Sequence, residues 1–166
     1  MKRKAVYPGT FDPVTYGHID LIKRALKIFE TVIIAVAHNA EKEPLVSVEE
    51  RIAMLKKATR GMKGVVIEDF GGLAVNYVRG KGSMVMIRGL RMLSDFEYEF
   101  QMALTNRKLA DNIETIFMMP HQDYSYVSSK LIKEAAMLGA DVGNFLPGKA
   151  EKAFWQWLLF TRWAIT

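Results

Sequence analysis

Five short runs of β-branched and apolar residues recur along the chain of 166 residues. Runs of this length are typical of strands that are buried on both faces of a sheet. Between them, apolar residues return at helical spacing, as Ile22, Ala25 and Phe29 do. An order of strand and helix repeated five times predicts a doubly wound five-stranded parallel sheet covered by helices on both faces, because parallel neighbours need right-handed crossovers. The runs lie at residues 5–7, 32–37, 65–68, 84–87 and 115–119.

Two helix starts are marked by capping boxes, in which a Ser side chain and a Glu three residues later each bind the other's backbone N–H. Ser47 and Glu50 form one, and Ser94 and Glu97 form the other, opening a helix that runs to about residue 109.

The remaining segments predict a helix at about residues 73–79 and further helices that start near Ser128 and Lys149. The last of these forms a C-terminal helix from about residue 150. No repeat, low-complexity segment or linker divides the chain, so we expect residues 1–166 to form a single domain.

Composition narrows the classes of site and partner. The chain has no cysteine, which excludes disulfides and thiolate metal sites and suits a cytoplasmic protein. The longest apolar stretch, at residues 153–165, is interrupted by Gln156, Thr161 and Arg162, so we expect no membrane partner. The net charge of +5 fits either a basic surface or a site for anions. The sequence contains no long basic run of the kind that binds nucleic acid, so we expect no nucleic-acid partner.

Ligands of a doubly wound sheet bind where strands end and helices begin. The five junctions expected here are residues 8–18, 38–47, 70–73, 88–94 and 120–130. In the first, Gly9 allows close approach of a ligand, and Gly17 and His18 open a helix whose free N–H groups favour a phosphate. His18 could instead cap that helix or lie in the core, but the flanking glycines favour the phosphate role. No P-loop motif is present.

Four motifs occur in one order along residues 4–147: "YPGTFDP", continued to Gly17 and His18, then "IRGLR", "DFEYE" and "SSKLIKE". In these motifs the chain resembles the phosphopantetheine adenylyltransferase family of the nucleotidylyltransferase superfamily. The resemblance implies a Rossmann-like nucleotidylyltransferase fold and reversible transfer of the adenylyl group of ATP to 4′-phosphopantetheine, in coenzyme A biosynthesis. Lys130 stands where this family has a small hydroxyl residue.

The resemblance also assigns site residues. It implies an ATP site made of Gly9, Thr10, Phe11, His18, Gly89, Leu90, Arg91, Glu99, Tyr124, Ser125, Tyr126, Val127, Ser128, Ser129 and Lys130. It implies a 4′-phosphopantetheine site made of Thr10, Lys42, Leu73, Ala74, Arg88 and Asn106. The catalytic set is His18, Thr10, Lys42, Arg88 and Arg91.

The residues alone leave alternatives open for several of these. Lys42 could be a solvated lysine of a charged loop. Arg88 and Arg91 could form salt bridges to Asp95 and Glu97 instead of binding phosphates. Ser128 and its neighbours could be an ordinary N-cap.

The reaction needs no protein base, because a phosphomonoester is largely ionised at neutral pH, with its second pKa about 6. We expect Mg²⁺ to be held mainly by the ATP phosphates, since no cluster of carboxylates encodes a metal site. The resemblance further implies a homohexamer. The alternatives are a related nucleotidylyltransferase acting on nicotinate mononucleotide or a polyol phosphate, and a non-catalytic nucleotide- or RNA-binding module.

Overall fold

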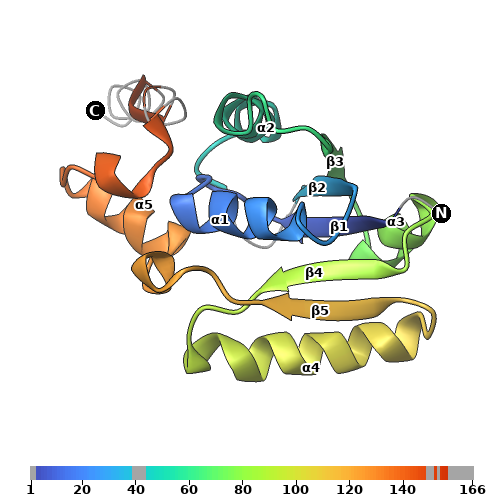
Figure 1. Ribbon diagram of the computed structural model, residues 1–166. Helices are drawn as coiled ribbons and strands as arrows, with labels where there is room; N and C mark the ends of the chain where they lie inside the picture. Colours follow the sequence, from blue (N-terminus) through green and yellow to red (C-terminus); the bar gives the residue numbers. More distant parts are fainter. Residues whose placement is uncertain (1–2, 39–43, 149–151, 153, 157–166) are drawn as a thin grey trace.

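The five predicted strands form one parallel sheet in the order β3-β2-β1-β4-β5 (Figure 1). A computed structural model describes residues 3–38, 44–148, 152 and 154–156. The strands are β1 (Lys4–Gly9), β2 (Thr31–Ala37), β3 (Val65–Phe70), β4 (Val85–Gly89) and β5 (Glu114–Met118). The chain order reverses between β1 and β4, so the predicted doubly wound α/β fold is confirmed and its switch point lies at the middle strand.

The strands alternate with five α-helices, as the sequence pattern predicts. They are α1 (Tyr16–Ala25), α2 (Val48–Ala58), α3 (Ala74–Gly80), α4 (Leu93–Leu109) and α5 (Ser129–Met137), with short 3₁₀ turns at Gln122–Tyr124 and Gly143–Phe145. None of the helices within the described part of the chain is long and apolar enough to span a membrane.

Neighbouring residues of the middle strand point to opposite faces of the sheet and build two cores. Tyr7 of β1 joins a core with Ile22 of α1 and Leu55 of α2. Val6 joins a second core with Val75 of α3 and Ile113. Figure 1 shows α1 and α2 on one side of the sheet and α4 below β5. The alternation of side chains therefore fixes which helices cover which face.

The capping box of Ser47 and Glu50 is confirmed, with bonds of 3.2 and 3.1 Å between side chain and backbone N–H. The capping box predicted at Ser94 is wrong. Helix α4 begins one residue before Ser94, and its N-cap, Met92, makes no side-chain capping bond. The carboxylate of Asp95, in the first turn of the helix, accepts from the backbone N–H of Arg91, which precedes the N-cap.

Only part of the predicted C-terminal helix lies within the described residues. Residues 152 and 154–156 are helical. Phe154 is completely buried and belongs to the same core as Leu55. Lys149, where this helix was expected to start, lies outside the described residues.

Candidate active site

A cavity of about 600 Å³ opens at the carboxyl ends of β1 and β4, at the switch point of the sheet. It is lined by segments from the first, fourth and last strand-to-helix junctions. The predicted site residues that it brings together are Gly9, Thr10, Phe11, His18, Arg88, Gly89, Arg91, Val127, Ser128, Ser129 and Lys130. Three junctions that are distant in sequence thus contribute to one hollow.

Other predicted residues do not line this cavity: Leu73, Ala74, Leu90, Glu99, Asn106, Tyr124, Ser125 and Tyr126. Lys42 lies outside the described residues. The cavity also includes residues of the predicted junctions that had no individual assignment to a ligand, namely Pro8, Asp12, Thr15, Gly17 and Pro120. Tyr7, Leu21 and Lys133 also line it, and they lie outside the predicted junctions.

The turn after β1 is closely packed around Phe11. A Cβ atom on Gly9 would lie 2.9 Å from the Phe11 ring, so only glycine fits there. Phe11 itself has a φ of 51°, a left-handed conformation that is uncommon for a residue other than glycine. Its ring packs edge-on against Tyr7 and His18, with centroids 5.3 and 5.0 Å apart. The turn therefore forms a rigid wall beside the His18 imidazole.

His18 caps its helix with one ring nitrogen, and its other ring nitrogen makes no hydrogen bond to the residues that the structure describes. Its Nδ1 accepts from the backbone N–H of Thr15 at 3.0 Å, while its own N–H donates to Thr15 Oγ1 at 3.4 Å. An Nδ1 that accepts a backbone N–H carries no proton, so the proton of the neutral ring is on Nε2. Because His18 also lines the cavity, the capping role and the phosphate role are compatible.

The His18 ring is neutral at pH 7. Burial and, to a smaller extent, the nearby Arg91 guanidinium together lower its pKa from 6.5 to about 4. A neutral imidazole still donates from Nε2, so His18 can stabilise an anionic oxygen without releasing or accepting a proton.

Two helix N-termini meet at the cavity. Gly17 and His18 lie in the first turn of α1, while Ser129 and Lys130 open α5. The first N–H groups of a helix have no partner within it and carry partial positive charge, so both ends attract an anion. The Ser129 hydroxyl donates to the Pro13 carbonyl at 2.9 Å, which ties α5 to the turn before α1. That hydroxyl proton is therefore used, and Ser129 offers a ligand its backbone N–H.

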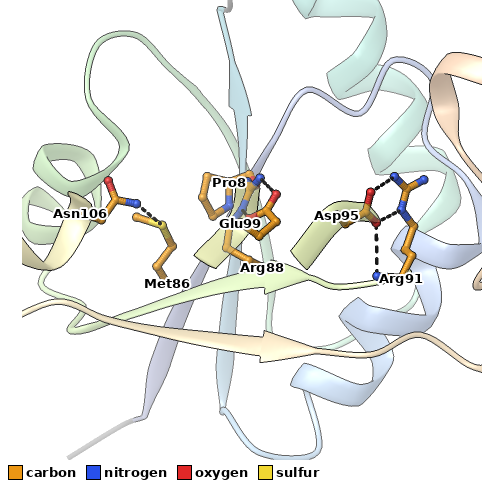
Figure 2. Close-up of polar contacts among 7 residues, drawn as sticks. All are labelled: Pro8, Met86, Arg88, Arg91, Asp95, Glu99 and Asn106. Atoms are coloured by element: carbon orange, nitrogen blue, oxygen red, sulfur yellow. Dashed lines mark hydrogen bonds and ion pairs between the residues drawn. The ribbon is translucent and has the colours of Figure 1, made fainter. Parts of the chain in front are cut away.

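Arg88 is fixed in place by two neighbours. Its Nε and Nη2 donate to the two carboxylate oxygens of Glu99 at 2.7 and 2.5 Å, and its Nη1 donates to the Pro8 carbonyl at 2.9 Å (Figure 2). Burial opposes its charge, but the hydrogen bonds to Glu99 outweigh this and raise the pKa of Arg88 above its ordinary value. Two of its five N–H donors remain for a ligand.

Arg91 is held similarly, from the other side of the cavity. Its Nε and Nη2 donate to Asp95 at 3.0 and 3.1 Å, and its Nη1 donates to the Val127 carbonyl at 2.8 Å. The salt bridge of Arg91 to Asp95 expected as an alternative is thus present, whereas Arg88 pairs with Glu99 and not with either predicted acid. Each pairing orients a guanidinium that still borders the cavity.

Three residues predicted for the 4′-phosphopantetheine site, namely Leu73, Ala74 and Asn106, lie near the second core of the sheet. The Asn106 amide of α4 approaches the sulfur of Met86 at 3.8 Å, well away from Arg91 (Figure 2). Ala74 packs against the core that contains Met86, and Leu73 is the exposed N-cap of α3. These residues stay predictions, since the cavity described above does not reach them.

The lysines and arginines that line the cavity differ in whether a carboxylate pairs with them. Arg88, Arg91 and Lys133 each have a carboxylate partner, namely Glu99, Asp95 and Asp12. Lys130 forms no ion pair with any residue in the described ranges, and it lines the cavity.

The cavity offers no evident carboxylate for a metal ion. Asp12 is the acid among its lining residues, and its oxygens already accept from Leu45 N–H, Val46 N–H and Lys133. Within residues 3–38 and 44–148, no group of three or more His, Cys, Asp or Glu side chains could hold a metal.

The known proteins that this chain resembles are nucleotidylyltransferases. The sequence profile of the cytidylyltransferase-like family matches residues 6–135. The phosphopantetheine adenylyltransferase of Caldanaerobacter subterraneus is 51% identical over 145 residues, which cover 87% of this chain and 91% of that protein. That of Thermodesulfovibrio yellowstonii is 47% identical over 154 residues, or 92% and 96% of the two chains.

The fold is shared more widely. The nicotinic acid mononucleotide adenylyltransferase of Plasmodium falciparum superposes with a TM-score of 0.71 over 97% of this chain and 98% of that one. At 12% sequence identity this likeness establishes the nucleotidylyltransferase fold alone. With close relatives over nearly its whole length and the matching fold, the chain belongs to the cytidylyltransferase-like family and, within it, to the phosphopantetheine adenylyltransferases.

Proposed function

We propose that this protein transfers the adenylyl group of ATP to 4′-phosphopantetheine, forming dephospho-coenzyme A and pyrophosphate in a reversible step of coenzyme A biosynthesis. Membership of the phosphopantetheine adenylyltransferases supports this reaction. The observation that carries it is a neutral His18 that lines a cavity where two helix N-termini and two oriented arginines meet.

The bond changes need only positioned donors. A phosphate oxygen of 4′-phosphopantetheine attacks the α-phosphorus of ATP, and the bond from that phosphorus to the bridging oxygen breaks. The electron pair leaves with pyrophosphate, so no protein nucleophile or base takes part. Catalysis consists of holding two anions in line and stabilising the charge that develops on the α-phosphoryl oxygens.

We assign the residues to these tasks by their places. His18 Nε2–H and Thr10 face the α-phosphate, where the first junction supplies them. The two unused donors of Arg88 hold the attacking phosphate, and Arg91 with the start of α5 holds the β- and γ-phosphates. Glu99, predicted as part of the ATP site, is assigned here to orienting Arg88, because both of its carboxylate oxygens bind that guanidinium.

The remaining assignments depend on the resemblance. Lys42 joins Arg88 on the attacking phosphate, Gly9, Phe11, Gly89 and Leu90 shape the ATP site with residues 124–130, and Leu73, Ala74 and Asn106 line the pantetheine arm. Mg²⁺ on the triphosphate would neutralise charge on the leaving group. We expect phosphate and water to supply most of its ligands, since Asp12, the acid among the lining residues, already accepts three hydrogen bonds.

We also infer a homo-oligomer, and a homohexamer by the family resemblance. Helix α4 supports it: along its 17 residues only Glu99 is buried, and its exposed residues include Leu93, Phe96, Phe100 and Leu104. An apolar surface of this kind is typical of an interface between subunits. We further propose a single cytoplasmic domain, since the two cores described share one sheet and the sequence contains no cysteine.

One assay tests the function: pyrophosphate release from MgATP with 4′-phosphopantetheine, beside nicotinate mononucleotide and glycerol phosphate. Among the three acceptors, we expect turnover only with 4′-phosphopantetheine. Faster turnover with nicotinate mononucleotide would identify the protein as the related enzyme. Nucleotide binding without pyrophosphate from any acceptor would favour the non-catalytic module, whose RNA affinity should fall steeply with salt.

A further inference from the structure

Arg51 of α2 is completely buried, with 0% of its surface exposed, and its guanidinium is surrounded by backbone carbonyls. Its Nη1 donates to the Thr10 carbonyl oxygen at 2.7 Å and to the Ala37 carbonyl oxygen at 3.1 Å. Its Nε donates to Val46 at 3.0 Å and to Ser47 at 3.3 Å. One buried cation thus joins the turn after β1, the end of β2 and the start of α2.

Asp12 reinforces the same junction from the other side of the turn. This carboxylate is 3% exposed, and it accepts from Leu45 N–H at 2.8 Å and from Val46 N–H at 3.1 Å. Lys133 of α5 donates to it at 2.7 Å. Arg51 and Asp12 therefore hold the turn after β1 to the segment before α2 through two separate sets of bonds.

Phe11 lies between these two anchor points. A left-handed residue other than glycine costs roughly 1–3 kcal/mol and persists only where its surroundings fix it. Here the preceding carbonyl, that of Thr10, is bound by Arg51, and the following side chain, that of Asp12, is bound on three sides. The strained conformation presses the Phe11 ring against His18.

A buried charge is a poor way to gain stability, because apolar residues of similar size serve as well or better. Arg51 has no carboxylate partner among the described residues, and its Nη2 has no hydrogen-bond partner there. A planar fork that reaches several carbonyls at once is suited instead to fixing the relative positions of backbone segments.

We infer that Arg51 is a positioning residue for the α-phosphate end of the cavity: it holds the Thr10 carbonyl, maintains the strained Phe11, and so places Thr10 and His18. Arg51 itself does not line the cavity, and it acts on the ligand only through these residues. The inference rests on the proposed adenylyl transfer for its kinetic consequence, but its structural consequence is independent of that reaction.

The test compares variants of Arg51 with a stability control on the same helix. Arg51→Met removes the fork, and Arg51→Lys keeps the charge but cannot reach all four carbonyls. Met54→Ala is the control, since Met54 is buried in the same helix and its removal creates a cavity without touching the turn. All are assayed at saturating substrates, at a temperature where each is fully folded.

We expect kcat to fall about 100-fold in Arg51→Met and about tenfold in Arg51→Lys, because small misplacements of catalytic groups have effects of this size. We expect Met54→Ala to keep the parent kcat even where its Tm falls further. If Arg51→Met does not fold, Arg51→Lys decides. A kcat in Arg51→Lys equal to that of the parent overturns the inference.

Hydrogen exchange of the ligand-free variants gives a readout without the reaction. We expect faster exchange in residues 8–14 and 44–47 of the Arg51 variants than in Met54→Ala at equal global stability. Unchanged protection of these two segments overturns the inference even if activity falls. If the parent protein releases no pyrophosphate, the proposed function fails and this exchange comparison alone decides the role of Arg51.

Discussion

Glu99 places its two carboxylate oxygens 2.7 and 2.5 Å from Nε and Nη2 of Arg88, and it thereby aims the unused edge of the guanidinium at the cavity. The pair joins α4 to the end of β4 across eleven residues of sequence (Figure 2). Such two-point pairing fixes the plane of the guanidinium as well as its position.

Replacing Glu99 should weaken binding of the attacking phosphate. In Glu99→Gln an NH₂ group replaces one carboxylate oxygen, and this group cannot accept a hydrogen bond from Arg88. The guanidinium therefore loses its fixed plane. We expect kcat/KM for 4′-phosphopantetheine to fall ~10–100-fold, the size of one charge-assisted hydrogen bond, with KM for ATP nearly unchanged. Glu97→Gln, at an exposed position of the same helix, is the matched control. Equal losses for both substrates would contradict the role given to Glu99.

His18 should act as a neutral donor. We expect His18→Ala to lower kcat by ~10²–10³, the effect of removing one oxyanion donor, with little change in ATP affinity. The measurement is steady-state kinetics together with nucleotide binding by calorimetry. If only KM rises and kcat is retained, His18 binds the substrate without stabilising the transition state.

The protonation of His18 gives a separate prediction. Burial lowers its pKa to about 4 in the folded protein, below the 6.5 of an unperturbed imidazole. The unfolded chain therefore takes up a proton as the pH falls through 6.5 and the folded protein does not, so the free energy of unfolding should fall between pH 6.5 and 4. NMR titration of the ligand-free protein should show a His18 transition near pH 4. A transition near 6.5 would contradict the burial argument.

Lys130 should supply much of the net positive charge that the triphosphate meets. Arg88, Arg91 and Lys133 are each partly neutralised by a carboxylate, whereas Lys130 has no such partner among the described residues. We expect Lys130→Ser to raise KM for ATP about tenfold at low salt and to reduce the dependence of that KM on ionic strength. Lys63→Ser, at an exposed site outside the cavity, should do neither. An unchanged KM in Lys130→Ser would show that this lysine points to solvent.

A charge on α4 should disrupt the proposed oligomer. Leu104 is 49% exposed in the single chain, and a carboxylate there would be costly to bury between subunits. We expect Leu104→Glu to lower the mass measured by light scattering, whereas Thr105→Glu on the same helix has a smaller effect. A monomeric parent protein would contradict the oligomer directly.

The fold followed from the sequence because hydrophobic periodicity is a local signal. The five strands and five helices appear in the predicted order, and the box at Ser47 and Glu50 caps α2 as expected. At Ser94 the same motif does not form a cap, because the helix starts at Leu93 and Ser94 lies inside its first turn. A capping motif therefore acts only where its Ser stands directly before the first helical residue.

The site was harder to predict wherever partners are distant in sequence. The glycines and His18 stand in one recognisable turn, so that half of the cavity was predicted. The pairing of Arg88 with Glu99, in place of Asp95 or Glu97, depends on how α4 lies against β4. The burial of Arg51 depends on three segments that meet only in the folded chain. No single stretch of sequence records these contacts.

The bond between Asp12 and Lys133 has a consequence for how the protein is made. The two residues are 121 positions apart, so the buried Asp12 leaves the ribosome long before its counter-charge does. Until α5 has been synthesised, the turn after β1 carries a carboxylate without its cation, and the second helix N-terminus of the cavity does not exist. The ability to bind a nucleotide should therefore arise late in synthesis, once the chain has passed Lys133.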